Sequence, residues 1–125
     1  MNPTVLNRYL TSNTAILPAY TPDKFAVVSA VSITAEATLL TPTTGKRWRL
    51  LGCILSASAA GNILLRDNTA GTSIAIIPSA AGGFGTFVDF GHRGIASAAT
   101  NNVLTAQLSV AGTVSGTLLY IEETI

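Results

Sequence analysis

Apolar and polar residues alternate with a period of two through most of this chain, from Phe25 onward. Between Val31 and Leu39, the apolar side chains occupy the odd positions, and Ser, Thr and Glu occupy the even ones. A period of two separates the two kinds of side chain onto opposite faces of a strand, whereas an amphipathic helix needs a period near 3.6. The pattern therefore predicts a chain built from strands.

Turn-forming residues divide this region into short segments at regular spacing. Seven to eight strands are expected, with no convincing helix, which predicts an all-β, antiparallel, jelly-roll-like β-sandwich. An immunoglobulin-like sandwich is the alternative, although its Cys, Trp and Cys framework is missing. The predicted breaks are Pro42–Gly45, Ala59–Asn62, Asp67–Gly71, Ala81–Gly83 before a strand from Phe84 to Phe90, the longer loop Gly91–Asn102, and a tight hairpin at Ala111–Gly112.

The segment from Lys46 to Ser56 has the strongest strand pattern. Counting by two places Trp48, Leu50 and Ile54 on one face and Arg47, Arg49, Leu51, Cys53 and Leu55 on the other. Its second half is apolar on both faces, which predicts a central, covered strand. Cys53 is the one cysteine, so no internal disulfide is possible. Neighbouring arginines would lower the pKa of its thiol, but the flanking Ile54 and Leu55 favour a buried, inert residue.

Charge is scarce in this chain. Only 10% of its residues are charged, against about 25% in an ordinary globular domain. Because a monomer usually stays soluble through charges of both signs and small apolar patches, this composition favours a component of an assembly. The alternative is a merely uncharged surface, with the N-terminal residues folded back over one sheet. A net charge of +1 predicts neither nucleic acid nor an anionic membrane surface as a partner.

Residues 1–24 differ from the domain expected over residues 25–125. Three prolines, Pro3, Pro18 and Pro22, interrupt this first segment, so we expect an extended arm. It shows neither a signal peptide nor the roughly 20 apolar residues of a membrane span. Its apolar side chains are expected to lie on a partner surface: Val5, Leu6, Tyr9, Leu10, Ile16, Leu17 and Tyr20.

Residues for catalysis or metal binding are sparse. A triad would need the one histidine, His92, with Asp89 or Asp67 and a serine, but no Gly-x-Ser-x-Gly motif supports it. No carboxylate pair or zinc ligand set is evident, although a metal shared through His92 on an oligomer axis is an alternative. Gly82–Gly85 lacks the lysine and helix of a phosphate loop. We expect no enzyme activity and no cofactor.

The run from Lys46 to Arg49 places Trp48 among basic residues. Such interleaving can stack on single-stranded nucleic acid, but Trp48 is expected to face away from both arginines. Arginine is enriched at protein interfaces because its planar guanidinium binds carboxylates with two hydrogen bonds. The charged residues expected at an interface are Arg47, Arg49, Arg66, Asp67 and Arg93.

The stretch Thr41–Asp67, TPTTGKRWRLLGCILSASAAGNILLRD, resembles a pattern in small structural proteins of tailed bacteriophages. There a Gly-Lys-Arg strand start precedes a Leu-Leu-Gly strand, a Ser-Ala turn and a strand ending in Arg-Asp. Residues 101–123 are similar in style to their last hairpin. The resemblance, over roughly residues 41–122, is to the jelly-roll capsid decoration, or cement, proteins. It implies a homo-oligomer, a dimer or trimer, made in the host cytoplasm and bound outside the phage head at junctions of the major capsid protein.

The expected function is therefore a structural protein of the virion that bridges and stabilises neighbouring capsid subunits. A protein that binds only the assembled shell stabilises it by mass action. Deleting residues 1–20 is expected to leave the sandwich folded and to weaken shell binding. The alternative is a receptor- or carbohydrate-binding module of a phage tail or fibre, although 6% aromatic residues is low for that role.

Overall fold

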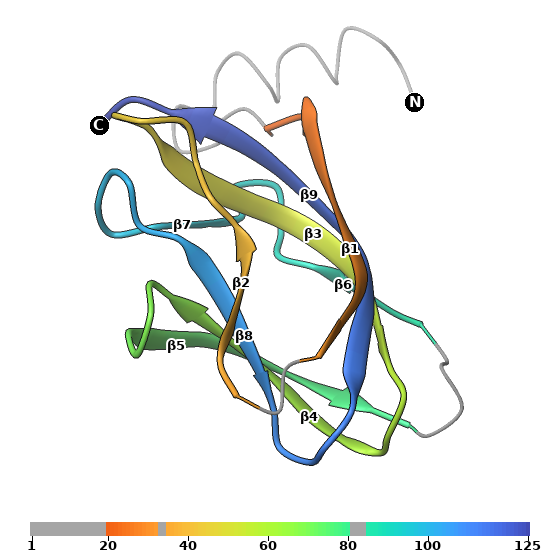
Figure 1. Cartoon of the computed structure of the whole chain (residues 1–125). Helices are drawn as coiled ribbons and strands as arrows, with labels where there is room; N and C mark the ends of the chain where they lie inside the picture. Colours follow the sequence, from red (N-terminus) through yellow and green to blue (C-terminus); the bar gives the residue numbers. More distant parts are fainter. Residues whose placement is uncertain (1–19, 33–34, 81–84) are drawn as a thin grey trace, which may run out of the picture.

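Strands account for all the regular structure of the described residues, which are 20–32, 35–80 and 85–125 in the computed structural model (Figure 1). Nine strands and no helix lie in these ranges, in two antiparallel sheets. For the described residues the prediction of an all-β chain is confirmed, and the arrangement is consistent with a β-sandwich. Phe84 and the predicted arm contacts Val5, Leu6, Tyr9, Leu10, Ile16 and Leu17 lie outside the described residues.

The first sheet, called sheet A here, contains the two longest strands side by side at its centre (Figure 1). Its strand order is β1-β9-β3-β6, and the short β7 pairs with β3 beyond the end of β6. The central position predicted for the Lys46–Ser56 segment is thereby confirmed. The bounds are β1 Lys24–Ser32, β3 Arg47–Ala57, β6 Thr86–Asp89, β7 Ile95–Ala96 and β9 Thr113–Glu123.

The second sheet, sheet B, has the order β2-β8-β4-β5 and packs against the inner face of sheet A. Trp48 and Leu118 of sheet A and Ile63 and Leu65 of sheet B are completely buried between the layers. Burial of each such side chain contributes about 1.5–3 kcal/mol, so this shared core holds the sheets together. The bounds are β2 Ala37–Leu40, β4 Gly61–Asp67, β5 Thr72–Ser79 and β8 Leu104–Leu108.

Strand β3 carries a bulge at Leu51 that reverses its faces. Opposite β9, Leu50 pairs with Tyr120 and Gly52 pairs with Leu119, so Leu51 is an extra residue. Even-numbered residues point into the core before the bulge and odd-numbered ones after it. The predicted faces were therefore correct before the bulge and wrong after it: Ile54 is 46% exposed, away from Trp48, and Cys53 lies in the core, away from the arginines. Counting by two fails because one inserted residue shifts every later side chain to the opposite face.

Most connections between consecutive strands cross from one sheet to the other. Among the described strands, β4 and β5 are the one consecutive pair that hydrogen-bonds, through the predicted turn Asp67–Gly71. The hairpin predicted at Ala111–Gly112 was wrong, because β8 belongs to sheet B and β9 to sheet A. The loop Gly91–Asn102 contains β7. Turn residues show where a chain reverses, but not which strand it meets afterwards.

Candidate functional site

The described end of the arm is held against one end of sheet A. Two guanidinium groups contact the ring of Tyr20, whose centroid is 4.8 Å from Cζ of Arg49 and 4.6 Å from Cζ of Arg93. The backbone N–H of Tyr20 donates a hydrogen bond of 2.8 Å to the carbonyl oxygen of His92. Each cation–π contact contributes about 0.5–2 kcal/mol. Tyr20 thus anchors the point at which residues 1–19 join the domain.

A carboxylate joins two of the predicted interface arginines beside Tyr20. Oε1 of Glu123 lies 2.8 Å from Nε of Arg47 and 2.8 Å from Nη2 of Arg49. Partial burial tends to raise the pKa of Glu123, but hydrogen bonds and charge from Arg49 and Arg47 outweigh burial and lower it below its ordinary value. Nη1 of Arg49 also donates to the carbonyl oxygen of Arg93 at 2.8 Å. The structure therefore gathers Tyr20, Arg47, Arg49 and Arg93 into one site, called the arginine cluster here.

The other two predicted interface charges lie elsewhere and bind within the domain. Nη1 of Arg66 lies 3.5 Å from Oε1 of Glu36 and donates to Oε1 of Gln107 at 3.1 Å, on the outer face of sheet B. Asp67 is buried, and its carboxylate accepts hydrogen bonds from the Ser97 hydroxyl, the Ala98 N–H and the Asn102 amide. Asp67 thereby ties the loop after β7 to the end of β4. A contact of either residue with a partner stays a prediction.

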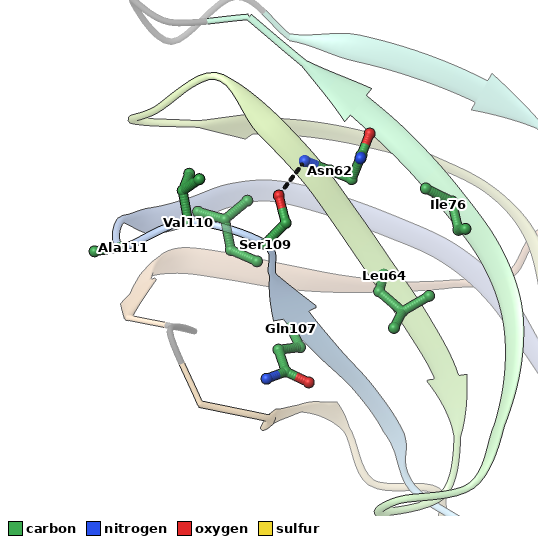
Figure 2. Close-up of a pocket in the computed structure, with 8 residues that line it drawn as sticks. Asn62, Leu64, Ile76, Gln107, Ser109, Val110 and Ala111 are labelled. Atoms are coloured by element: carbon green, nitrogen blue, oxygen red, sulfur yellow. Dashed lines mark hydrogen bonds between the residues drawn. The ribbon is translucent and has the colours of Figure 1, made fainter.

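A groove on sheet B was not anticipated from the sequence. Figure 2 shows Leu64 and Ile76 on neighbouring strands, with Val110 near the connection after β8. The cavity has a volume of about 390 Å³, and its polar lining comes from Asn62, Gln107 and Ser109. The Ser109 hydroxyl accepts a 2.9 Å hydrogen bond from the Asn62 backbone N–H. Such a lining supplies apolar contact and a few directional polar groups, but no ionised side chain.

The outer face of sheet A next to the arginine cluster is mostly apolar. A hollow of about 310 Å³ there has Tyr20, Pro22, Leu51, Phe87 and Leu119 in its lining, together with the ionisable Asp89 and His92. Beyond it, Phe25 and Val27 of β1 and Ile54 of β3 are exposed to solvent. The signal in the sequence was the run of β3 that is apolar on both faces, which we interpreted only as cover for a central strand.

Groups for chemistry are not assembled in the described part of the chain. There His92 is exposed, and no hydrogen bond joins its side chain to Asp89, Asp67 or a serine. No group of three or more His, Cys, Asp and Glu side chains that could hold a metal occurs in these ranges. Burial raises the pKa of the Cys53 thiol to about 11, which is the opposite of activation.

The chain matches no family model, no curated protein and no solved structure. Within the described ranges, no helix has the length and apolar character needed to cross a membrane.

Proposed function

We propose that this chain is a capsid decoration protein that binds the outside of a phage head and stabilises neighbouring copies of the major capsid protein. The observation that carries the proposal is that several charged side chains pair within the described domain while large apolar side chains remain exposed. Arg47 and Arg49 pair with Glu123, and Asp67 is buried. Meanwhile Val27 and Phe87 of sheet A and Ile76 of sheet B are each more than 60% exposed. Surfaces of this kind are typical of interaction sites.

The strand order supports a jelly-roll fold for this proposed structural protein. The orders β1-β9-β3-β6 and β2-β8-β4-β5 interleave the early and late strands of the chain in both sheets. A jelly roll wraps eight strands in this way as two Greek keys, and the fold is frequent in viral capsid proteins. We therefore propose that the domain is a jelly roll, with β7 as an additional short strand.

The arm supplies the proposed link to the shell. Tyr20 fixes its origin in the arginine cluster, and nineteen preceding residues could reach at most about 68 Å if extended. Its apolar side chains, from Val5 to Leu17, would then lie on a neighbouring capsid subunit. Because the protein binds the assembled shell and not free capsid subunits, each bound copy shifts the equilibrium toward the shell.

The test compares phage heads that carry the protein with heads from which it has been omitted. We expect the protein to be found on the outer surface of purified heads, and the heads that lack it to release DNA at a lower temperature. Adding purified protein back should restore the release temperature. Equal release temperatures with and without bound protein would contradict the stabilising role.

A deletion of residues 2–19 tests the arm and retains the Tyr20 anchor. We expect the variant to keep the far-ultraviolet circular dichroism spectrum of the domain and to lose occupancy on heads. The matched control is Tyr20→Ala in the full-length chain, which keeps residues 2–19 and removes the contacts of the Tyr20 ring with Arg49 and Arg93. Full occupancy after the deletion would show that the arm does not bind the shell.

The groove on sheet B supports a second candidate, a receptor- or carbohydrate-binding module of the tail. Its volume of about 390 Å³ fits a small ligand, and Asn62, Gln107 and Ser109 present polar groups. However, its lining contains no aromatic side chain on which a sugar ring could stack. Binding on a glycan array, abolished by Leu64→Arg, together with location at the tail tip, would favour this candidate. For either candidate we propose no catalysis, so His92→Ala is expected to leave the function unchanged.

A further inference from the structure

One row of side chains on the outer face of sheet A crosses the four strands β1, β9, β3 and β6, and its three apolar members are exposed while Thr117 is partly buried. The register aligns Val27 of β1 with Thr117 of β9, Thr117 with Ile54 of β3, and Ile54 with Phe87 of β6. Val27 is 77% exposed and Phe87 is 61% exposed. Phe25, in the next row, is 65% exposed. We call Phe25, Val27, Ile54, Phe87 and Thr117 the sheet A patch.

The described part of the chain covers only the neighbouring end of this face. Tyr20 lies over Arg49 and Arg93, on the side of sheet A where β7 pairs with β3, and β1 starts at Lys24 on the opposite edge. Residues 20–24 therefore cross the face beside the patch, with Tyr20 and Pro22 lining the hollow. The described residues therefore leave the patch itself uncovered.

The size of the patch matches one half of a dimer interface. Its exposed apolar surface is on the order of 400 Å², which lies within the range of the largest patches on monomers. A standard interface buries about 800 Å² per partner, of which roughly 60% is apolar. The patch, together with a polar rim of similar area, would therefore supply one partner's half of a standard interface.

We propose that the sheet A patch binds the same patch of a second copy of this chain. The five side chains of the patch carry no charge. The exposed Asp89 ends the neighbouring row, which begins at Phe25, so this carboxylate lies at the edge of the proposed contact. A two-fold axis parallel to the strands would lay the β1 edge of one copy over the β6 edge of the other. Val27 would then meet Phe87 of the other copy, and Thr117 would meet Ile54. Each contact combines a smaller and a larger side chain, as interlocking sheet faces about 10 Å apart require.

The test is the oligomeric state of the purified full-length chain, measured by sedimentation velocity over a range of concentrations. We expect a dimer at micromolar concentration, and monomers for Val27→Asp and Phe87→Asp. The matched control is Ile76→Asp, which changes a side chain of similar exposure, 63%, on sheet B and should leave the dimer intact. Circular dichroism checks that each variant is folded. Val27→Thr keeps the branched shape of the side chain and is expected to raise the dissociation constant of the dimer by about tenfold. This variant replaces Val27→Asp in the test if the aspartate variant fails to fold.

Several outcomes would overturn the dimer. The first is a wild-type chain that is monomeric throughout the concentration range. The second is a dimer that persists in Val27→Asp and Phe87→Asp, and the third is a dimer that is lost in Ile76→Asp. Loss of the dimer on deleting residues 2–19 would identify the arm of the second copy as the occupant instead. If the wild-type chain is monomeric and the patch variants no longer bind to heads, the patch binds the shell and not a second copy. Because sedimentation uses no shells, failure of this inference is distinguishable from failure of the decoration proposal.

Discussion

At the scale of single residues, the structure assigns partners that the pattern of charges did not indicate. The sequence led us to expect arginines at an interface, and Arg47, Arg49 and Arg93 do lie together. Their partners are Glu123 and Tyr20, which lie at opposite ends of the sequence from each other. A single sequence carries no signal for such pairs, because the contact exists only after β9 has paired with β3.

Glu123 is expected to contribute to stability in a pH-dependent way. Its pKa is lowered in the folded protein from an ordinary value of 4.5, so its contribution is fully present above pH 4.5 and is lost as pH falls through the lowered folded value. Glu123→Gln should lower the free energy of unfolding at pH 7 by roughly 1 kcal/mol. The difference from wild type should shrink below pH 4.5, as measured by urea unfolding. Glu122→Gln is the control, because a glutamine oxygen can still accept the hydrogen bond that the Thr43 N–H donates to Glu122. If the free energies of unfolding of Glu123→Gln and wild type differ by the same amount at all pH values, the ion pairing of Glu123 is contradicted.

Cys53 is expected to be unreactive in the folded protein. It is completely buried and burial raises its pKa to about 11, so the thiolate population at pH 8 is small and inaccessible. A chromogenic disulfide reagent should label it only after unfolding in urea. Rapid labelling of the native protein would show that the strand opens or that Cys53 is not in the core.

At the scale of elements, Gly116 determines how closely β9 can approach β3. Its φ of 152° is unfavourable for other residues, and a Cβ atom there would collide with the backbone carbonyl of Ile54. We expect Gly116→Ala to destabilise the domain by about 2 kcal/mol or more. Gly85→Ala is the control, because its Cβ would meet only a side-chain methyl of Ile54, at 3.5 Å. Equal unfolding midpoints in urea for the two variants would contradict this role.

The existence of strands was predictable at this scale, but their faces were predictable only in part. Around Trp48 and Leu50 the alternation gave the correct buried face. Beyond Leu51 it gave the wrong one, because a bulge is defined by pairing with β9 and not by the residues of β3 alone. The groove at Leu64 and Ile76 was missed for a related reason, since it exists only where β4 and β5 lie side by side.

At the scale of the whole molecule, the topology predicts slow folding. The strands at the two ends of the domain pair with each other, as Lys24 with Tyr120 shows. The loop that this contact closes spans nearly the whole domain, and two-state sandwiches with such non-local pairing fold in milliseconds to seconds. Stopped-flow refolding from urea, followed by Trp48 fluorescence, measures the rate. Complete refolding within microseconds would contradict the prediction of slow folding.

The sequence by itself determined that the described part of the chain is built from strands, because alternation with a period of two is a local property of the residues. It also showed that charge is too scarce to cover the surface, because composition does not depend on the fold. Only the tertiary structure decided which sheet each strand joins, where β3 reverses its faces and which apolar residues are left outside. These features arise from pairing between distant segments, such as β1 with β9, and local residue preferences do not specify such partners.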